Sequence, residues 1–132
     1  MRESINPTPR QNPNKASSFG GLILQTSTAQ ALQYMGYEVP TEIQKQSIPP
    51  LLGGRDVVGQ AQTGSGKTAA FGIPLVEAIS PGVSSTQAIV LVPTRVLAMQ
   101  VAGELRQIAS NQRINVSAVY GGQPIARQIT AL

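Results

Sequence analysis

The chain has 132 residues, enough for one compact domain with a modest core. Its content of 41% apolar and 12% charged residues excludes a wholly disordered chain. Cysteine and histidine are absent, which excludes disulfides, thiolate metal sites and the commonest zinc ligand and general base. Ten basic and six acidic residues give a net charge of +4, which favours a polyanionic partner without requiring one.

The N-terminal residues differ in composition from the rest of the chain. Residues 1–18 contain three prolines among polar side chains and almost nothing apolar to bury, so we predict a flexible tail there and a domain over 19–132. No segment is long and apolar enough to cross a bilayer, and no signal-peptide core is present. We therefore expect a cytoplasmic location.

Two helices are predicted in the first part of the domain. The first is capped by Ser27 or Thr28 and ends at Gly36, a residue type typical of helix C-termini. The second is capped by Thr41, and we expect the proline pair 49–50 to break it. Both helices precede the first predicted strand.

The remainder of the chain alternates strands with helices. Short apolar segments predict strands at 56–60, 87–92 and 114–120, and helical spacing predicts helices at 67–79, 95–110 and from Pro124 to Leu132. This alternation predicts the α/β class, with a parallel β-sheet flanked by helices. The sequence stops inside the last helix, so we expect the fold to be incomplete on its C-terminal side.

The strongest chemical signal is the stretch 61–68, which reads Ala-Gln-Thr-Gly-Ser-Gly-Lys-Thr and lies between a predicted strand and a predicted helix. This is the setting of a P-loop, whose backbone amides surround phosphate oxygens. We expect Lys67 to reach the β- and γ-phosphates and Thr68 to bind Mg²⁺, as the catalytic pair. The other candidate phosphate-binding residues are Gln62, Thr63, Gly64, Ser65 and Gly66. The usual pattern begins with glycine, where this chain has Ala61.

Other phosphate-binding proteins share parts of this pattern. A dinucleotide fold needs an acidic residue about twenty positions further on, and residues 84–89 contain none. A GTPase needs Asn-Lys-x-Asp, but Asn14-Lys15 is followed by alanine and serine. The P-loop alone leaves small-molecule kinases and motor ATPases open.

Segments on both sides of the P-loop narrow the choice among these classes of phosphate-binding protein. They are Phe19 with residues 36–44 (GYEVPTEIQ), residues 93–100 (PTRVLAMQ) and the glycine pair 121–122. Together with the P-loop they resemble, in order and spacing, the Q motif, motif I, motif Ia and GG motif of DEAD-box ATP-dependent RNA helicases. The resemblance implies the N-terminal part of a RecA-like first domain. Alanine is common at the first position of this family's motif I.

The resemblance implies a nucleotide site specific for adenine. Gln44 would read the base, because its amide satisfies the adenine N6 donor and N7 acceptor together. Phe19 would stack on the base, and we set core packing aside for it. Tyr37 and Thr41 join the candidate nucleotide-binding residues, although we favour core packing for Tyr37.

The resemblance also implies an RNA interface. Contacts to the sugar-phosphate backbone would come from Pro93, Thr94, Arg95, Gly121 and Gly122, with the glycines letting RNA approach main-chain amides. Val96 stands where the family usually has glutamate, which puts the local helix start and the RNA affinity in question.

Hydrolysis requires a carboxylate at a strand end to hold Mg²⁺. After Thr68 the only carboxylates are Glu77 and Glu104, both inside predicted helices. The resemblance places the family's Asp-Glu-Ala-Asp motif, its Ser-Ala-Thr motif and its second domain beyond Leu132. We therefore expect this chain to bind ATP or ADP without hydrolysing ATP, and a short non-enzymatic regulator stays open as an alternative.

Overall fold

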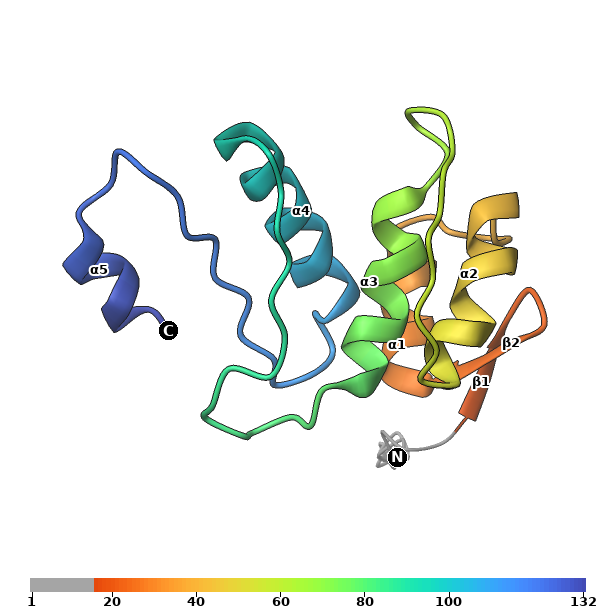
Figure 1. Cartoon of the computed structure of the whole chain (residues 1–132). Helices are drawn as coiled ribbons and strands as arrows, with labels where there is room; N and C mark the ends of the chain where they lie inside the picture. Colours follow the sequence, from red (N-terminus) through yellow and green to blue (C-terminus); the bar gives the residue numbers. More distant parts are fainter. Residues whose placement is uncertain (1–15) are drawn as a thin grey trace, which may run out of the picture.

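The computed structural model of the chain describes residues 16–132, so most of the predicted tail lies outside the described residues. Figure 1 shows helices α1 to α4 grouped together, with α5 apart from them. The elements are β1 (Ala16–Phe19), β2 (Leu22–Gln25), α1 (Thr26–Tyr34), α2 (Glu42–Leu52), α3 (Lys67–Ala78), α4 (Arg95–Ile108) and α5 (Ile125–Thr130). None of these helices is long and apolar enough to span a membrane.

The first element is a β-hairpin that the sequence analysis missed. Strands β1 and β2 pair antiparallel with Phe19 opposite Leu22. Gly20 and Gly21 form the turn with φ of +54° and +88°, the left-handed conformation that two-residue hairpins favour. The predicted tail boundary is therefore wrong at residues 16–18, which belong to β1. Two adjacent glycines between apolar residues were the available signal.

The N-terminus of helix α1 is capped by a side chain from helix α3. Ser27 and Thr28, the predicted caps, are buried inside the helix. The backbone N–H of Gln25, the N-cap residue, instead donates to both carboxylate oxygens of Glu77 on α3, at 3.1 and 3.0 Å. The predicted end at Gly36 is confirmed, because this residue follows the helix with φ of +79°.

Helix α2 begins as predicted but runs further. Thr41 is its N-cap, and the helix continues through the proline pair 49–50. The predicted break is wrong because the carbonyls that lose N–H partners belong to Lys45 and Gln46, which are exposed and accessible to water. Ile48, fully buried in the core, holds this part of the helix in place.

The core lies between the helices and the hairpin. Gly72 allows α3 to approach α4 closely, since a Cβ there would lie 2.8 Å from Leu105 Cδ2 and 3.2 Å from Ile108 Cδ1. The buried core is largely aliphatic and comprises Phe19, Leu24, Leu32, Ile48, Ala69, Ile73, Val76, Ile108 and Ala109.

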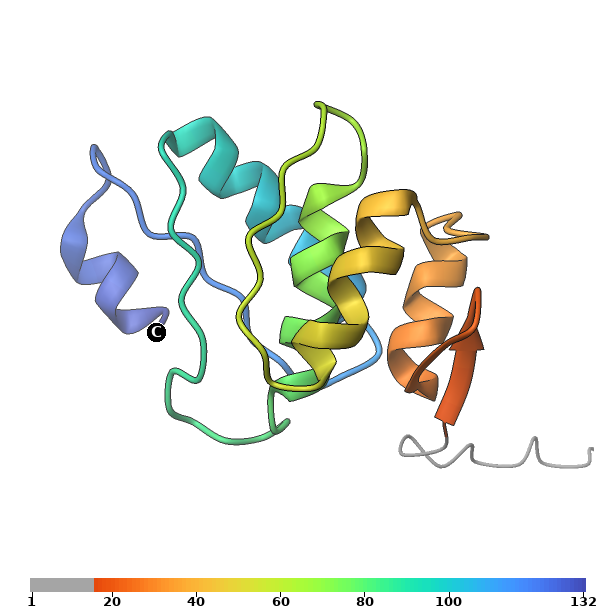
Figure 2. The same ribbon diagram turned by 45° about the vertical axis from the view of Figure 1, so that its right-hand side comes forward.

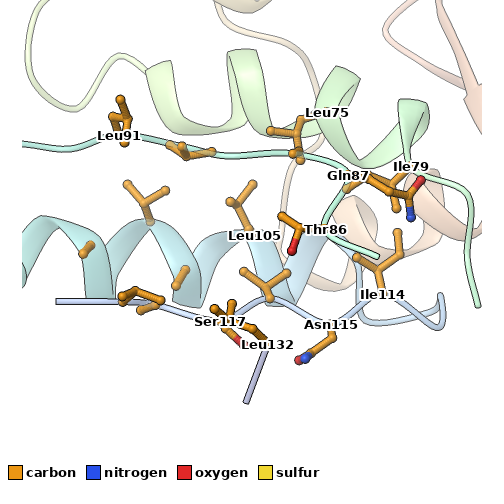
Figure 3. Close-up of a pocket in the computed structure, with 18 of the residues that line it drawn as sticks. Leu75, Ile79, Thr86, Gln87, Leu91, Leu105, Ile114, Asn115, Ser117 and Leu132 are labelled. Atoms are coloured by element: carbon orange, nitrogen blue, oxygen red, sulfur yellow. The ribbon is translucent and has the colours of Figure 1, made fainter. Parts of the chain in front are cut away.

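The expected parallel sheet is not formed within residues 16–132. Residues 56–60, 87–92 and 114–120 form no strands, and the single sheet is the β1–β2 hairpin. The last two segments line a shared cavity of about 660 Å³ (Figure 3). Ile89 and Leu91 remain 78% and 89% exposed. A strand requires a hydrogen-bonded neighbour, and these segments have none within residues 16–132.

The cap of α1 gives a test of the fold. Hydrogen bonds to charged groups contribute about 1.5–3 kcal/mol when buried, so we expect Glu77→Ala to lower the free energy of unfolding by about 1–2 kcal/mol at this half-buried site. Urea denaturation measures the loss. The control is Glu38→Ala, which removes an exposed carboxylate. Equal stability of the two variants would contradict the capping role.

Candidate functional site

The glycine-rich loop 61–66 leads directly into α3. Gly64 and Gly66 adopt φ of +78° and +85°, and Gly66 is the N-cap residue of α3. A Cβ on Gly66 would lie 2.4 Å from Gln44 Nε2 and 3.2 Å from Thr41 Oγ1. Glycine is therefore required here both by the backbone and by the close approach of α2.

The N-terminus of α2 holds this loop through two side chains. Thr41 Oγ1 donates to the carbonyl of Ser65 at 2.8 Å, and Gln44 Nε2 donates to the carbonyl of Gly66 at 3.1 Å. Gln44 Oε1 also accepts from the backbone N–H of Thr41 at 3.0 Å, which closes a capping box. The structure thus brings two predicted nucleotide-binding side chains against the predicted phosphate loop.

The Gln44 amide retains hydrogen-bonding capacity beyond these contacts. An amide has two N–H donors and two acceptor lone pairs, and one of each is used here. The remaining N–H and lone pair match the N7 acceptor and N6 donor of adenine. Because Gln44 is only 2% exposed, a base reaches this amide only when the surrounding segment opens.

The lysine of the loop is bound to the loop itself. Lys67 Nζ donates to the carbonyls of Ala61 and Gln62 at 2.5 and 2.6 Å. Ser65 Oγ donates to the same Gln62 carbonyl at 2.6 Å. Two of the three ammonium N–H donors are used in this way, so one donor of Lys67 remains for a phosphate oxygen.

Phe19 lies in the core rather than at an open face. Its ring is 5% exposed and packs within the buried cluster, so the prediction that set core packing aside for Phe19 is wrong. The adjoining Gly20 lies against Pro40, since a Cβ on Gly20 would be 2.1 Å from Pro40 Cδ. Phe19 thus anchors the hairpin that packs beside the start of α2.

Tyr37 is half-buried against the core, which confirms the packing interpretation. Its hydroxyl donates to Glu104 Oε1 on α4 at 3.1 Å. Burial raises the pKa of Tyr37 above its usual value of 10.0, and the charge of Glu104 and the hydrogen bond to it add to this shift. Sequence analysis did not pair these residues, which are separated by 67 positions.

The predicted RNA-binding residues gather at the N-terminus of α4. Thr94 is the N-cap residue and its side chain accepts from the N–H of Leu97 at 3.2 Å. Arg95 Nη1 donates to the carbonyl of Gly121 at 2.8 Å. Pro93, directly before the cap, is also exposed. Figures 1 and 2 place this helix end and the glycine-rich loop at the same end of the molecule.

The residues that the structure describes contain no preformed metal site. Across residues 16–132 no group of three or more acidic, histidine or cysteine side chains is placed to hold an ion. Thr68, the predicted Mg²⁺ ligand, lies half-buried in the first turn of α3. The 660 Å³ cavity does not include the glycine-rich loop, and we interpret it as the space between extended segments that do not pair.

Comparison with known proteins identifies the family. A sequence model of the DEAD/DEAH box helicases matches residues 41–132. The chain belongs to the DEAD/DEAH box helicase family. This confirms the family resemblance drawn from the sequence.

Named members of the family are similar to most of this chain. The DEAD-box ATP-dependent RNA helicases CshA of Bacillus licheniformis and Bacillus subtilis are each 53% identical over 115 residues, which is 87% of this chain. These residues cover 24% and 23% of the two relatives. The chain therefore spans about a quarter of the length of the curated helicases it matches.

Solved helicase structures share the fold. A DEAD box protein from Methanococcus jannaschii has a TM-score of 0.82 at 43% identity, over 86% of this chain and 31% of that one. The RNA helicase Prp28 from Chaetomium thermophilum, bound to ADP, has a TM-score of 0.73 at 34% identity, over 90% of this chain and 30% of that one. The α/β RecA-like class predicted from the sequence is confirmed, although residues 16–132 form only a short sheet.

The contact between Tyr37 and Glu104 predicts an alkaline loss of stability. Because the pKa of Tyr37 is higher in the folded chain than in the unfolded chain, the unfolded chain loses its proton first as the pH rises. The contribution of the Tyr37 hydroxyl to the free energy of unfolding is complete below about pH 10. It is lost as the pH rises through the pKa of Tyr37 in the folded chain.

We expect wild type to lose more stability than Tyr37→Phe between about pH 9 and pH 11, measured by urea denaturation. Tyr34→Phe, which removes an exposed hydroxyl, is the control for loss of a phenol. If Tyr37→Phe and wild type show the same alkaline slope, the hydroxyl contact makes no contribution.

Proposed function

We propose that the chain is the ATP-binding front part of an ATP-dependent RNA helicase, in which ATP binding and hydrolysis by the whole protein are coupled to RNA duplex unwinding. The observation that carries this proposal is the contact of Thr41 and Gln44 with the main chain of Ser65 and Gly66. This contact supports the proposal because it holds the Gln44 amide against the loop that leads into Lys67.

In this proposal the nucleotide lies along the N-termini of α2 and α3. Loop amides and the positive end of α3 surround the phosphates. Lys67 exchanges its two carbonyl partners for phosphate oxygens, and Thr68 holds Mg²⁺ that arrives with the nucleotide. Gln44 uses its remaining N–H and lone pair for adenine. Stacking of Phe19 on the base stays a prediction and requires the hairpin turn to move.

RNA binds, in this proposal, at the N-terminus of α4. Arg95 and the helix end supply positive charge, and Thr94 supplies a hydroxyl beside it. These groups contact the sugar-phosphate backbone, which suits an enzyme that does not read sequence.

The chain alone is proposed to bind ATP without turning it over. The two carboxylates that follow Thr68 are both engaged in contacts between elements: Glu77 accepts from Gln25, and Glu104 accepts from Tyr37. Neither is positioned to hold Mg²⁺ and orient a water. Phosphate release with saturating RNA is expected to stay at background, and turnover that disappears in Lys67→Ala would contradict this.

Base selectivity tests the proposed role of Gln44. Paired base contacts of this type contribute roughly 1–3 kcal/mol, so wild type is expected to prefer ADP to GDP by about tenfold. Gln44→Ala should lose most of this preference. Titration calorimetry with both nucleotides measures the ratio.

Two further variants separate the base contact from other effects. Gln46→Ala, an exposed glutamine on the same helix, should keep the ADP preference. Lys67→Ala should weaken ADP and GDP binding alike, since its contacts are to phosphates. An unchanged ADP-to-GDP ratio in Gln44→Ala would remove the adenine-reading role, whatever its effect on stability.

A further inference from the structure

We propose that Gln128 is a positioning residue for RNA binding: its amide fixes the main-chain turn at 121–122, so that the N–H groups of the two glycines are held in place for the RNA backbone. Gln128 itself does not contact RNA. This inference rests on the proposed function, because RNA is the ligand that the turn meets beside Arg95.

The amide of Gln128 bonds the main chain on both sides of this turn. Its Oε1 accepts from the N–H of Tyr120 at 2.8 Å, and its Nε2 donates to the carbonyl of Tyr120 at 3.1 Å. The same Nε2 donates to the carbonyl of Gln123 at 3.4 Å, a longer and weaker contact. Tyr120 directly precedes the two glycines and Gln123 directly follows them. One side chain therefore spans the whole turn.

Burial contributes little to holding this turn or helix α5. The helix has no buried residue, and it lies apart from the other helices (Figure 1). Within residues 121–132, Gln128 is the one residue that is not exposed. Gly122 adopts φ of +86°, and glycine has more backbone freedom than any other residue. The contacts of Gln128 are therefore what keeps the turn in one conformation.

The turn has unused main-chain donors beside a cation. Among residues 16–132, neither the N–H of Gly121 nor that of Gly122 has a hydrogen-bond partner. The carbonyl of Gly121 accepts from Arg95 Nη1 at 2.8 Å, which places the guanidinium next to these donors. A Cβ on Gly121 would meet no neighbour within 4 Å, so a ligand can approach there. Amide donors beside an arginine match the oxygens of a sugar-phosphate backbone.

The donors of Gln128 indicate that it positions the turn and does not bind RNA. A side-chain amide has two N–H donors, and the carbonyls of Tyr120 and Gln123 use both. None is left for a phosphate oxygen, which only accepts hydrogen bonds. Gln128 therefore acts on RNA through the main chain that it holds. Because the turn is already ordered, less conformational entropy is lost when RNA binds.

The alternative is that Gln128 only attaches α5 to the rest of the chain. The helix end has a second attachment, because Asn115 Nδ2 and Ser117 Oγ donate to the carbonyl of Ala131 at 3.2 and 2.9 Å. If attachment of α5 is what matters, loss of this second contact weakens RNA binding as loss of the Gln128 amide does. If the conformation of the turn is what matters, only Gln128 is needed.

The experiment measures binding of a fluorescent single-stranded RNA oligonucleotide by anisotropy over a series of salt concentrations. Gln128→Met keeps the length of the side chain but removes its amide, so it should weaken binding roughly three- to tenfold. The slope of log affinity against log salt should not change, because no charge is lost. The double variant Asn115→Ala/Ser117→Ala should bind as wild type does. So should Gln107→Met, which replaces an exposed glutamine on α4.

Amide hydrogen exchange followed by NMR tests the positioning role in the free chain. The N–H of Tyr120 should lose its protection in Gln128→Met and keep it in Asn115→Ala/Ser117→Ala. Urea denaturation should give the same midpoint for Gln128→Met and wild type, because Gln128 is not part of the buried core. A loss of RNA binding is then not due to unfolding.

Three results overturn the inference without touching the proposed function. They are equal RNA binding by Gln128→Met and wild type, an equal loss in Asn115→Ala/Ser117→Ala, and a changed salt slope in Gln128→Met. Arg95→Ala tests the proposed function separately, because loss of one phosphate contact should reduce the slope by about 0.7. If the wild-type chain does not bind the oligonucleotide, or if Arg95→Ala leaves the slope unchanged, the RNA interface of the proposed function fails and the inference fails with it.

Discussion

The hydrogen bonds between the N-terminus of α2 and the glycine-rich loop are the interaction on which the site depends. Gln44 caps α2, holds the Gly66 carbonyl and keeps one donor and one acceptor unused. A side chain at Gly66 would collide with the side chains of Gln44 and Thr41, so only glycine fits there. The hairpin supports the arrangement from the other side, with Gly20 packed on Pro40 just before the cap. In the proposed function, base recognition and phosphate binding therefore meet at this one junction between two helices.

The two cations of the proposed site, Lys67 and Arg95, are held in the same way. Lys67 donates to the carbonyls of Ala61 and Gln62, and Arg95 donates to the carbonyl of Gly121. A neutral carbonyl orders a cationic side chain, but a phosphate oxygen forms a charge-assisted bond about twice as strong. Each cation is therefore preorganised and can still be transferred to a phosphate. The two cations differ in the donors that they keep, because Lys67 has one N–H left and Arg95 has four.

Local features of the sequence predicted local features of the structure. The glycine-rich turn before α3, the Thr41 cap and the Gly36 terminus depend on backbone conformation and on neighbours within a few residues, so a single sequence reveals them. The contacts of Gln25 with Glu77 and of Tyr37 with Glu104 span 52 and 67 positions and arise only from helix packing. No pattern in one sequence pairs such residues.

The predictions that failed also depend on contacts between residues far apart in the sequence. Helix α2 passes through two prolines because tertiary burial of Ile48 outweighs local propensity. Its motif position predicted that Phe19 stacks on the adenine base, but the burial of Phe19 depends on the β1–β2 hairpin, which was not predicted. The extended segments have the composition of buried strands, yet a strand requires a paired neighbour. Within residues 16–132 the segments 87–92 and 114–120 border a cavity instead.

The structure of this chain with ADP and Mg²⁺ bound tests the account most directly. We predict that Lys67 Nζ leaves the carbonyls of Ala61 and Gln62 for the β-phosphate, and that the Gln44 amide meets adenine N6 and N7. We also predict that the contacts of α2 with the Ser65 and Gly66 carbonyls persist. ADP bound away from this junction, or bound while Lys67 still contacts both carbonyls, would contradict the account.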